Sequence, residues 1–199
     1  MGSFCYSERM YKSILFDFFD VIAPDFYRVW LEKNGHQRTG EYLALAQDID
    51  NGKIDLQEYY ARLSKLSGQT AGSLQQEFEN NVQFDTQVLQ LIDNLHRNYR
   101  IVLVTNSPST MVRIILQKNN LEHLFDEIII SGEVSYVKPD REIFELALQR
   151  MGILASEAIF IDDLQPYIDG AKRLGITGIQ FKNAEQLEND LQKLGVAVD

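Results

Sequence analysis

The chain of 199 residues is poor in several features that would narrow its class. It has a single cysteine, Cys5, so no intrachain disulfide can form, and a reducing, cytoplasmic compartment is expected. Its apolar runs have only the length of strands, and the first residues lack the apolar stretch of a signal peptide. We therefore expect no membrane span and no export. Hydrophobic residues make up 45% and charged residues 24%, which is ordinary for a globular protein and favours neither a disordered nor a fibrous chain.

Positive charge is also scarce, since 19 Lys and Arg residues face 29 Asp and Glu residues and give a net charge of −10. No basic stripe is present that could follow a phosphate backbone, so nucleic acid is not expected as a partner. An acidic protein can still bind a phosphorylated small molecule where local positive groups or a divalent cation outweigh the repulsion. Such a site must carry its own cation.

What the sequence does contain is a series of short apolar runs rich in Ile, Val and Phe, at residues 13–18, 101–105, 127–131, 158–162 and 176–181. These runs are typical of buried parallel strands. Segments with helical spacing separate the last four, at residues 109–119, 141–150 and 167–173. The alternation predicts an α/β fold, a doubly wound parallel sheet covered by helices on both faces.

Residues 21–84 have no strand pattern and show four helical segments instead, around residues 26–33, 41–46, 56–66 and 73–80. We expect an inserted helical domain here, called the helical insert below, while residues 1–20 and 85–199 form the α/β core. Asp55 is placed to cap the third segment. Four aromatic residues at helical spacing are expected to pack in the core of the insert rather than to form a substrate cage. They are Tyr27, Trp30, Tyr59 and Tyr60.

Polar residues stand where the apolar runs end. In open α/β sheets ligands bind beyond the carboxyl ends of the strands, so these residues are expected to share one pocket. They are Asp17, Thr105, Asn106, Asp162 and Asp163, together with Lys138 in the loop after the third strand. Three unpaired carboxylates would repel one another strongly in a desolvated cleft. A divalent cation resolves that conflict, and hard oxygen ligands favour Mg²⁺.

With these strand-end residues, the chain resembles the haloacid dehalogenase-like superfamily, in the branch with a helical cap between the first two motifs. Four motifs occur in the family's order and span nearly the whole chain. They are ILFDFFDV, VLVTN, the Lys of VKPDREIF, and FIDD followed by a helix with Gly170 and Ala171. The resemblance implies a Mg²⁺-dependent phosphatase that acts on a small phosphorylated substrate.

The resemblance also implies roles for single residues. Asp17 would attack phosphorus and form an aspartyl-phosphate, which divides one difficult displacement into two easier ones. Thr105 and Asn106 would hold the phosphoryl group, and Lys138 would neutralise charge on the nucleophile and on the phosphoryl oxygens. The metal would be held by Asp162, Asp163, Asp17 and the main-chain carbonyl of Phe19. Ser107 is expected to cap the next helix, with Pro108 at its first position, so that N–H groups face the anion.

One position departs from the family pattern. Family phosphatases usually have a second Asp two residues after the nucleophile, where this chain has Phe19, and Asp20 comes one residue too late. That acid protonates the leaving oxygen and then activates water, which contributes about 10²–10⁴-fold in rate. Slow turnover is therefore expected unless a shifted loop lets Asp20 reach the site.

Two other functions remain open from the sequence. The first is metal-independent dehalogenation of a 2-haloacid, because such enzymes often have an aromatic residue at the position of Phe19, although their fourth motif usually lacks the acids at 162 and 163. The second is a non-catalytic protein that binds phosphate and has lost turnover together with the second Asp.

Overall fold

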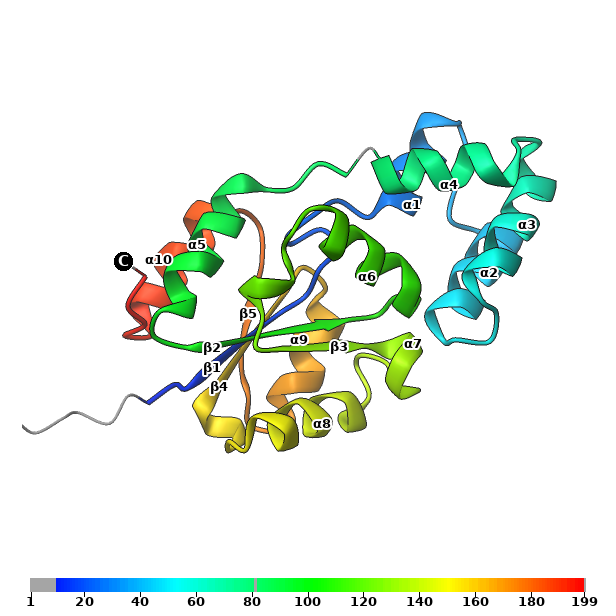
Figure 1. The fold of residues 1–199 in the computed structure, drawn as a ribbon. Coiled ribbons are helices and arrows are strands. Elements are labelled where there is room, and N and C mark those ends of the chain that lie inside the picture. The colour runs from blue at the N-terminus through cyan, green and yellow to red at the C-terminus, as the bar shows by residue number, and fades with distance from the viewer. Residues whose placement is uncertain (1–9, 81, 199) are drawn as a thin grey trace, which may run out of the picture.

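The computed structural model describes residues 10–80 and 82–198, with only the backbone of residues 109 and 110, so Cys5 lies outside the described part. A parallel sheet of five strands forms its centre, in the order β3-β2-β1-β4-β5 (Figure 1). The strands are β1 (Ser13–Phe16), β2 (Arg100–Thr105), β3 (Glu127–Ile130), β4 (Ala158–Asp162) and β5 (Thr177–Gln180). The predicted doubly wound parallel sheet is confirmed.

Helices cover both faces of the sheet because the side chains of each strand alternate between two apolar layers. Ile14 and Phe16 of β1 pack into one buried cluster, and Leu15 packs into the other. The first cluster includes side chains of three helices, α5 (Thr86–His96), α6 (Ser109–Lys118) and α10 (Ala184–Lys193). The second includes α8 (Arg141–Met151) and α9 (Gln165–Lys172).

Helices α5 and α10 were not predicted, although the buried positions of α5, at Val88, Leu91, Ile92 and Leu95, follow the helical period. Shorter elements complete the core, namely η1 (Glu122–Leu124), α7 (Ser131–Val134) and η2 (Ala155–Glu157). None of the helices in the part of the chain described here is both long and apolar enough to cross a bilayer.

The helix α6 begins at Ser109, as the predicted segment 109–119 does, but the predicted cap is wrong by one residue. Pro108 has an extended backbone, with φ −63° and ψ 132°, and occupies the cap position, so the helix begins at Ser109. Ser107 therefore does not cap the helix. Its N–H instead donates to the Ser131 hydroxyl at 3.0 Å, which ties the loop after β2 to α7.

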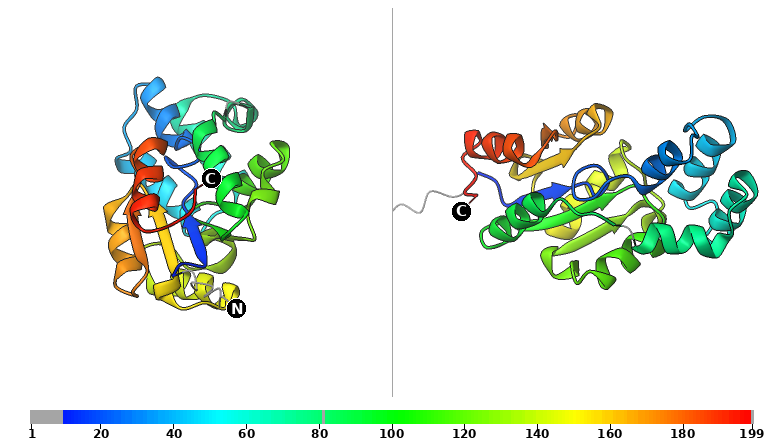
Figure 2. Two further views of the ribbon diagram at one scale, coloured as in Figure 1. Left: turned by 90° about the vertical axis from the view of Figure 1, so that its left-hand side faces the viewer. Right: turned by 90° about the horizontal axis from the view of Figure 1, so that it is seen from above.

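The helical insert contains four helices, α1 (Phe26–Lys33), α2 (Gly40–Asp50), α3 (Leu56–Ser67) and α4 (Ala71–Asn80). They lie beyond the carboxyl ends of the strands, to one side of the sheet (Figures 1 and 2). Asp55 caps α3 as predicted, since its carboxylate accepts the Glu58 N–H at 2.8 Å. The four aromatic residues named above are buried together. The exact domain boundaries stay a prediction.

Candidate active site

The carboxyl ends of β1 and β4 place Asp17, Asp162 and Asp163 beside Lys138, and these four residues are called the strand-end cluster. The Lys138 ammonium lies 2.7 Å from Asp17 Oδ1 and 2.7 Å from Asp162 Oδ2. The side chains of Lys138, Asp17 and Asp162 are only 1%, 8% and 0% exposed. A single buried cation is therefore shared between two buried carboxylates.

This sharing sets the charges of the cluster. Burial raises the pKa of Asp17, and the Lys138 ammonium opposes the rise only in part, while Asp162 adds to it. For Lys138, burial by itself lowers the pKa, but the two carboxylates outweigh it and hold the pKa above its usual value. The ammonium is charged at neutral pH, and the cluster still has more carboxylates than cations.

Asp162 and Asp163 are adjacent in sequence but differ in their contacts. Asp162 uses both oxygens within the protein, because Oδ2 binds Lys138 and Oδ1 accepts the Leu164 N–H at 2.8 Å. Asp163 is partly exposed, and burial, Asp162 and Asp20 raise its pKa to about 6. Asp163 is therefore better placed to bind a ligand from outside the protein.

The three carboxylates fit a divalent cation. One side-chain oxygen from each of Asp17, Asp162 and Asp163 lies within 4.8 Å of the others. A hard cation prefers such oxygen ligands, and its charge would lower the raised pKa values of Asp17 and Asp163.

The loop that carries Lys138 is held from two sides. Asn106 Oδ1 accepts the Lys138 N–H at 2.8 Å, and Asn106 Nδ2 donates to the Lys138 carbonyl at 3.0 Å. Behind the loop, a Cβ at Gly170 would lie 2.8 Å from the Pro139 oxygen, so only glycine lets α9 approach this closely. The Asn106 side chain thus fixes the position of Lys138 through its backbone.

Thr105, the last residue of β2, has a fully buried hydroxyl with no hydrogen-bond partner among the described residues. Buried polar groups normally have a partner, and an exception requires an explanation. A bound anion at the strand ends would supply one.

Phe19 and Asp20 follow Asp17 closely but do not contribute a free acid. The Phe19 ring packs edge-on against Phe18 and Phe26, with centroids 5.1 and 5.5 Å away. Asp20 has a left-handed backbone (φ 55°), and its carboxylate accepts two N–H groups of Arg28, the shorter at 2.6 Å, and the Asp25 N–H. Asp20 is therefore engaged with the helical insert.

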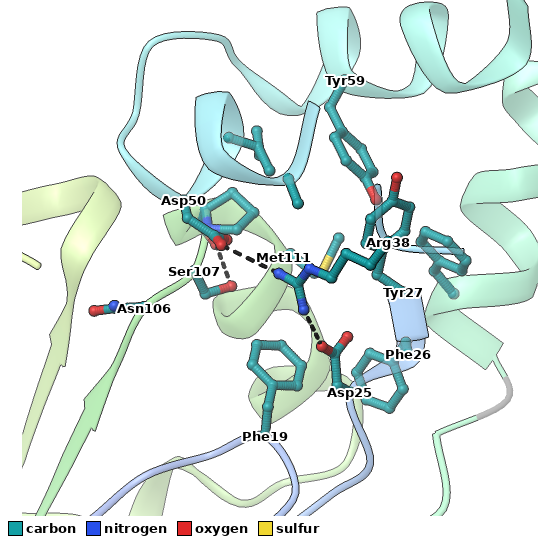
Figure 3. A pocket seen from close by; sticks show the side chains of 14 residues that line it. Phe19, Asp25, Phe26, Tyr27, Arg38, Asp50, Tyr59, Asn106, Ser107 and Met111 are labelled. Atoms are coloured by element: carbon teal, nitrogen blue, oxygen red, sulfur yellow. Dashed lines mark hydrogen bonds and ion pairs between the residues drawn. The ribbon is translucent and has the colours of Figure 1, made fainter. Parts of the chain in front are cut away.

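A pocket lies between the helical insert and the core, and it is called the insert pocket (Figure 3). From the core it is lined by Phe19, Met111 and the loop at residues 106–108. The insert contributes apolar and aromatic side chains together with Asp25, Arg38 and Asp50.

Several residues around the site were not predicted from the sequence. Asp25 carried the usual signal of a helix cap, and it caps α1 by accepting the Arg28 N–H at 3.1 Å. For Arg38, Asp50 and Ser131 the sequence offered no signal. Tyr167, whose ring centre lies 5.0 Å from the Lys138 ammonium, was placed only on a helix.

A model of the haloacid dehalogenase-like hydrolase family matches residues 14–181, which include the whole strand-end cluster. The chain belongs to this family. It is therefore an enzyme of a hydrolase family. The family indicated by the four motifs is confirmed, and the branch with a helical cap stays a prediction.

Curated relatives of this haloacid dehalogenase-like hydrolase include phosphatases. D-ribitol-5-phosphate phosphatase of Bacteroides thetaiotaomicron is 26% identical over 203 residues, which cover 92% of this chain and 97% of that protein. Glyceraldehyde 3-phosphate phosphatase of Methanothermobacter thermautotrophicus is 32% identical over 99 residues, 49% of this chain and 43% of that protein.

Solved structures share the fold. A family enzyme from Bacteroides thetaiotaomicron, crystallised as an Asp-to-Ala mutant with magnesium and inorganic phosphate, has a TM-score of 0.73 at 22% identity and covers 86% of this chain and 94% of its own. A hydrolase of the family from Porphyromonas gingivalis has a TM-score of 0.73 at 21% identity, covering 94% and 99%.

Proposed function

We propose that this hydrolase is a Mg²⁺-dependent phosphatase that cleaves phosphate monoesters of small molecules through an aspartyl-phosphate on Asp17. The observation that carries the proposal is the strand-end cluster, in which one buried ammonium orients Asp17 beside two further carboxylates. The phosphatases among the relatives support it. The reducing, cytoplasmic compartment expected from the single cysteine belongs to the same proposal.

Asp17 has one oxygen available for attack. Its contacts with Lys138 and with the Phe18 N–H both use Oδ1, at 2.7 Å each, and Oδ2 accepts no hydrogen bond from the described residues. In the proposed reaction Oδ2 forms a bond to phosphorus while the bond from phosphorus to the ester oxygen breaks. Water then attacks phosphorus, the bond to Asp17 breaks, and inorganic phosphate leaves.

The other residues stabilise charge in both steps. Lys138 faces Asp17 and balances the negative charge that develops on the phosphoryl oxygens. The unpartnered Thr105 hydroxyl donates a hydrogen bond to one of these oxygens. Asn106 acts mainly by holding the backbone of Lys138, and its part in binding the phosphoryl group stays a prediction.

Asp17, Asp162, Asp163 and the Phe19 carbonyl are proposed to hold Mg²⁺, and Asp162 also contacts Lys138. When bound, the ion would neutralise the carboxylates and polarise the phosphoryl group. Turnover is expected to be slow for alkyl esters, because Phe19 cannot protonate the leaving oxygen and Asp20 is bound to Arg28.

The experiment is hydrolysis of an aryl phosphate by the wild type, Asp17→Asn and Asp20→Asn, with Mg²⁺ and with EDTA. An aryl oxygen leaves without a proton, so the assay does not depend on the missing acid. We expect Mg²⁺-dependent turnover in the wild type and in Asp20→Asn, and none above background in Asp17→Asn. Metal-independent activity, or equal activity of Asp17→Asn, would contradict the proposal.

The same samples distinguish the alternatives. Chloride released from 2-chloropropionate and unaffected by EDTA would indicate a dehalogenase, against the retained Asp162 and Asp163. Phosphate binding without turnover of any ester would indicate the non-catalytic protein.

A further inference from the structure

The insert pocket lies next to the proposed reaction site. Phe19, two residues after the nucleophile, forms part of its wall, and so does Asn106, whose side chain holds the Lys138 loop. If the proposed function is correct, the phosphoryl group lies at the strand ends and the rest of the substrate extends into this pocket. The inference below rests on that function for its choice of ligand.

Three charged side chains line the insert pocket, and their net charge is negative when all three are ionised. Among the described lining residues the sole cation is Arg38, and the two carboxylates are Asp25 and Asp50. The Arg38 guanidinium lies 2.7 Å from Asp25 Oδ2 and 3.6 Å from Asp50 Oδ2, and it stands 5.8 Å from the centre of the Tyr27 ring (Figure 3). Arg38 is thus already neutralised and has no net positive charge for an anionic ligand.

Asp50 is fixed relative to the strand ends. Its main-chain carbonyl accepts the Ser131 hydroxyl at 2.9 Å, and the same hydroxyl accepts the Ser107 N–H at 3.0 Å. One buried side chain therefore joins the end of α2 to the loop after β2. The Asp50 carboxylate, 32% exposed, is held at the pocket and faces Arg38 (Figure 3).

The rest of the lining suits hydroxyl groups on a carbon skeleton. The charged trio offers N–H donors beside carboxylate acceptors, and a hydroxyl can use both at once. The Tyr59 hydroxyl points toward the same space in Figure 3. Aromatic rings of Phe19, Phe26 and Phe78 provide apolar walls for C–H groups. A carboxylate or a second phosphate would instead meet uncompensated negative charge.

We propose that Asp25, Arg38 and Asp50 restrict the substrate to phosphate monoesters of neutral hydroxylated compounds, polyols and sugars, and reject esters that carry a second anionic group. Asp50 is the specificity-determining residue, because it is the carboxylate in excess over the Arg38–Asp25 pair.

The test compares two esters that differ only in one terminal group, ribitol 5-phosphate and ribonate 5-phosphate. The first ends in a neutral alcohol and the second in a carboxylate. Assays are run at pH 8, above the pKa of about 7 to which burial raises Asp50 against the influence of Arg38. We expect kcat/KM to be higher for the polyol ester by about tenfold or more.

Asp50→Asn removes the excess charge, and the preference should fall by about threefold or more, through a lower KM for the acid ester. The matched control is Asp48→Asn on the same helix, whose carboxylate pairs with Lys53 and Arg62 away from the pocket and should leave the ratio unchanged. An equal or greater kcat/KM for the acid ester, or an unchanged ratio in Asp50→Asn, would overturn the inference.

Binding separates this inference from the proposed function. Both esters are titrated calorimetrically into Asp17→Asn with Mg²⁺. We expect Asp17→Asn to bind the polyol ester more tightly than the acid ester, and the double variant Asp17→Asn with Asp50→Asn to lose this preference. That result supports the proposed selectivity of the insert pocket even if the wild type turns over neither ester. Equal binding of the two esters refutes it even if hydrolysis is fast.

Discussion

Two groups of side chains in this molecule have the same composition, one cation between two carboxylates, in very different surroundings. At the strand ends Lys138 is 2.7 Å from both Asp17 and Asp162, and all three side chains are buried. In the insert pocket Arg38 is 2.7 Å from Asp25 but 3.6 Å from Asp50, and its side chain is 40% exposed.

The two groups differ in how much stability is lost when one ion-pair partner is removed. A buried charge that loses its partner cannot be solvated, so the strand-end cluster must stay complete. A partly exposed ion pair is screened by water and contributes little to stability. The first arrangement suits a fixed reaction, and the second suits selection among substrates.

Removing the cation of each group should give the largest contrast. Lys138→Met leaves two buried carboxylates without a cation to pair with, and we expect the free energy of unfolding to fall by about 3–5 kcal/mol. Arg38→Met should cost about 1 kcal/mol or less, because its partners remain in contact with solvent. Urea unfolding measures both losses. Losses of similar size would show that burial does not make the strand-end cluster more sensitive than the insert pocket to removal of its cation.

Phe19→Asp places a carboxylate between the strand-end cluster and the insert pocket, at the position where family phosphatases usually have their second Asp. We expect kcat for an alkyl phosphate to rise by about 10²-fold, and kcat for an aryl phosphate to rise less, because only the alkyl oxygen needs a proton. Phe19→Asn is the control of equal size without an ionisable group. If both variants gain equally, proton transfer is not the step that the wild type lacks.

Asp163→Asn tests the ligand that is free of Lys138. We expect the Mg²⁺ concentration for half-maximal activity to rise by about 10–100-fold, with part of the activity recovered at high Mg²⁺. Asp169→Asn, which changes an exposed acid on α9, should leave the Mg²⁺ dependence unchanged. An unaltered Mg²⁺ titration of Asp163→Asn would exclude Asp163 as a ligand.

The smallest effect is expected for stability as a function of pH. Burial raises the pKa of Asp50 from 3.8 to about 7. At a pH between these two values, Asp50 is protonated in the folded state and ionised in the unfolded state. This group therefore lowers stability progressively as pH rises from about 4 to 7, and its cost is constant above that.

Asp50→Asn lacks this titration. Its stability relative to the wild type should increase over the same pH range and then level off, by about 1 kcal/mol, since the carboxylate keeps contact with solvent. Thermal unfolding of both proteins from pH 5 to 8 gives the difference. A constant difference would mean that Asp50 has an ordinary pKa in the folded state.

The strand-end cluster could be predicted because it depends on short-range rules. Strands appear as apolar runs, parallel strands end at one edge, and the polar residues that follow them must meet there. The sequence therefore placed Asp17, Lys138 and Asp162 together before their contacts were known. The sequence did not show that Asp162 forms an ion pair with Lys138 while Asp163 stays available for a ligand.

The insert pocket depends on how helices pack, and the sequence has no short-range signal for that. Arg38 lies in the loop between α1 and α2, 13 residues from Asp25 and 12 from Asp50, and no period relates the three. The engagement of Asp20 by Arg28 was equally hidden, because it joins the loop after β1 to a side chain on α1. Local periodicity predicts elements, whereas contacts between loops and helices require the packed structure.

The position of the three charged pocket residues along the chain has a consequence for how new substrates arise. The residues of the proposed chemistry are spread from Asp17 to Asp163, whereas the charged trio lies within residues 25–50. A short stretch of gene can thus be exchanged or diversified without altering any codon of the reaction centre. The enzyme is a practical starting point for directed evolution, with a library confined to this stretch and screened on panels of phosphate esters.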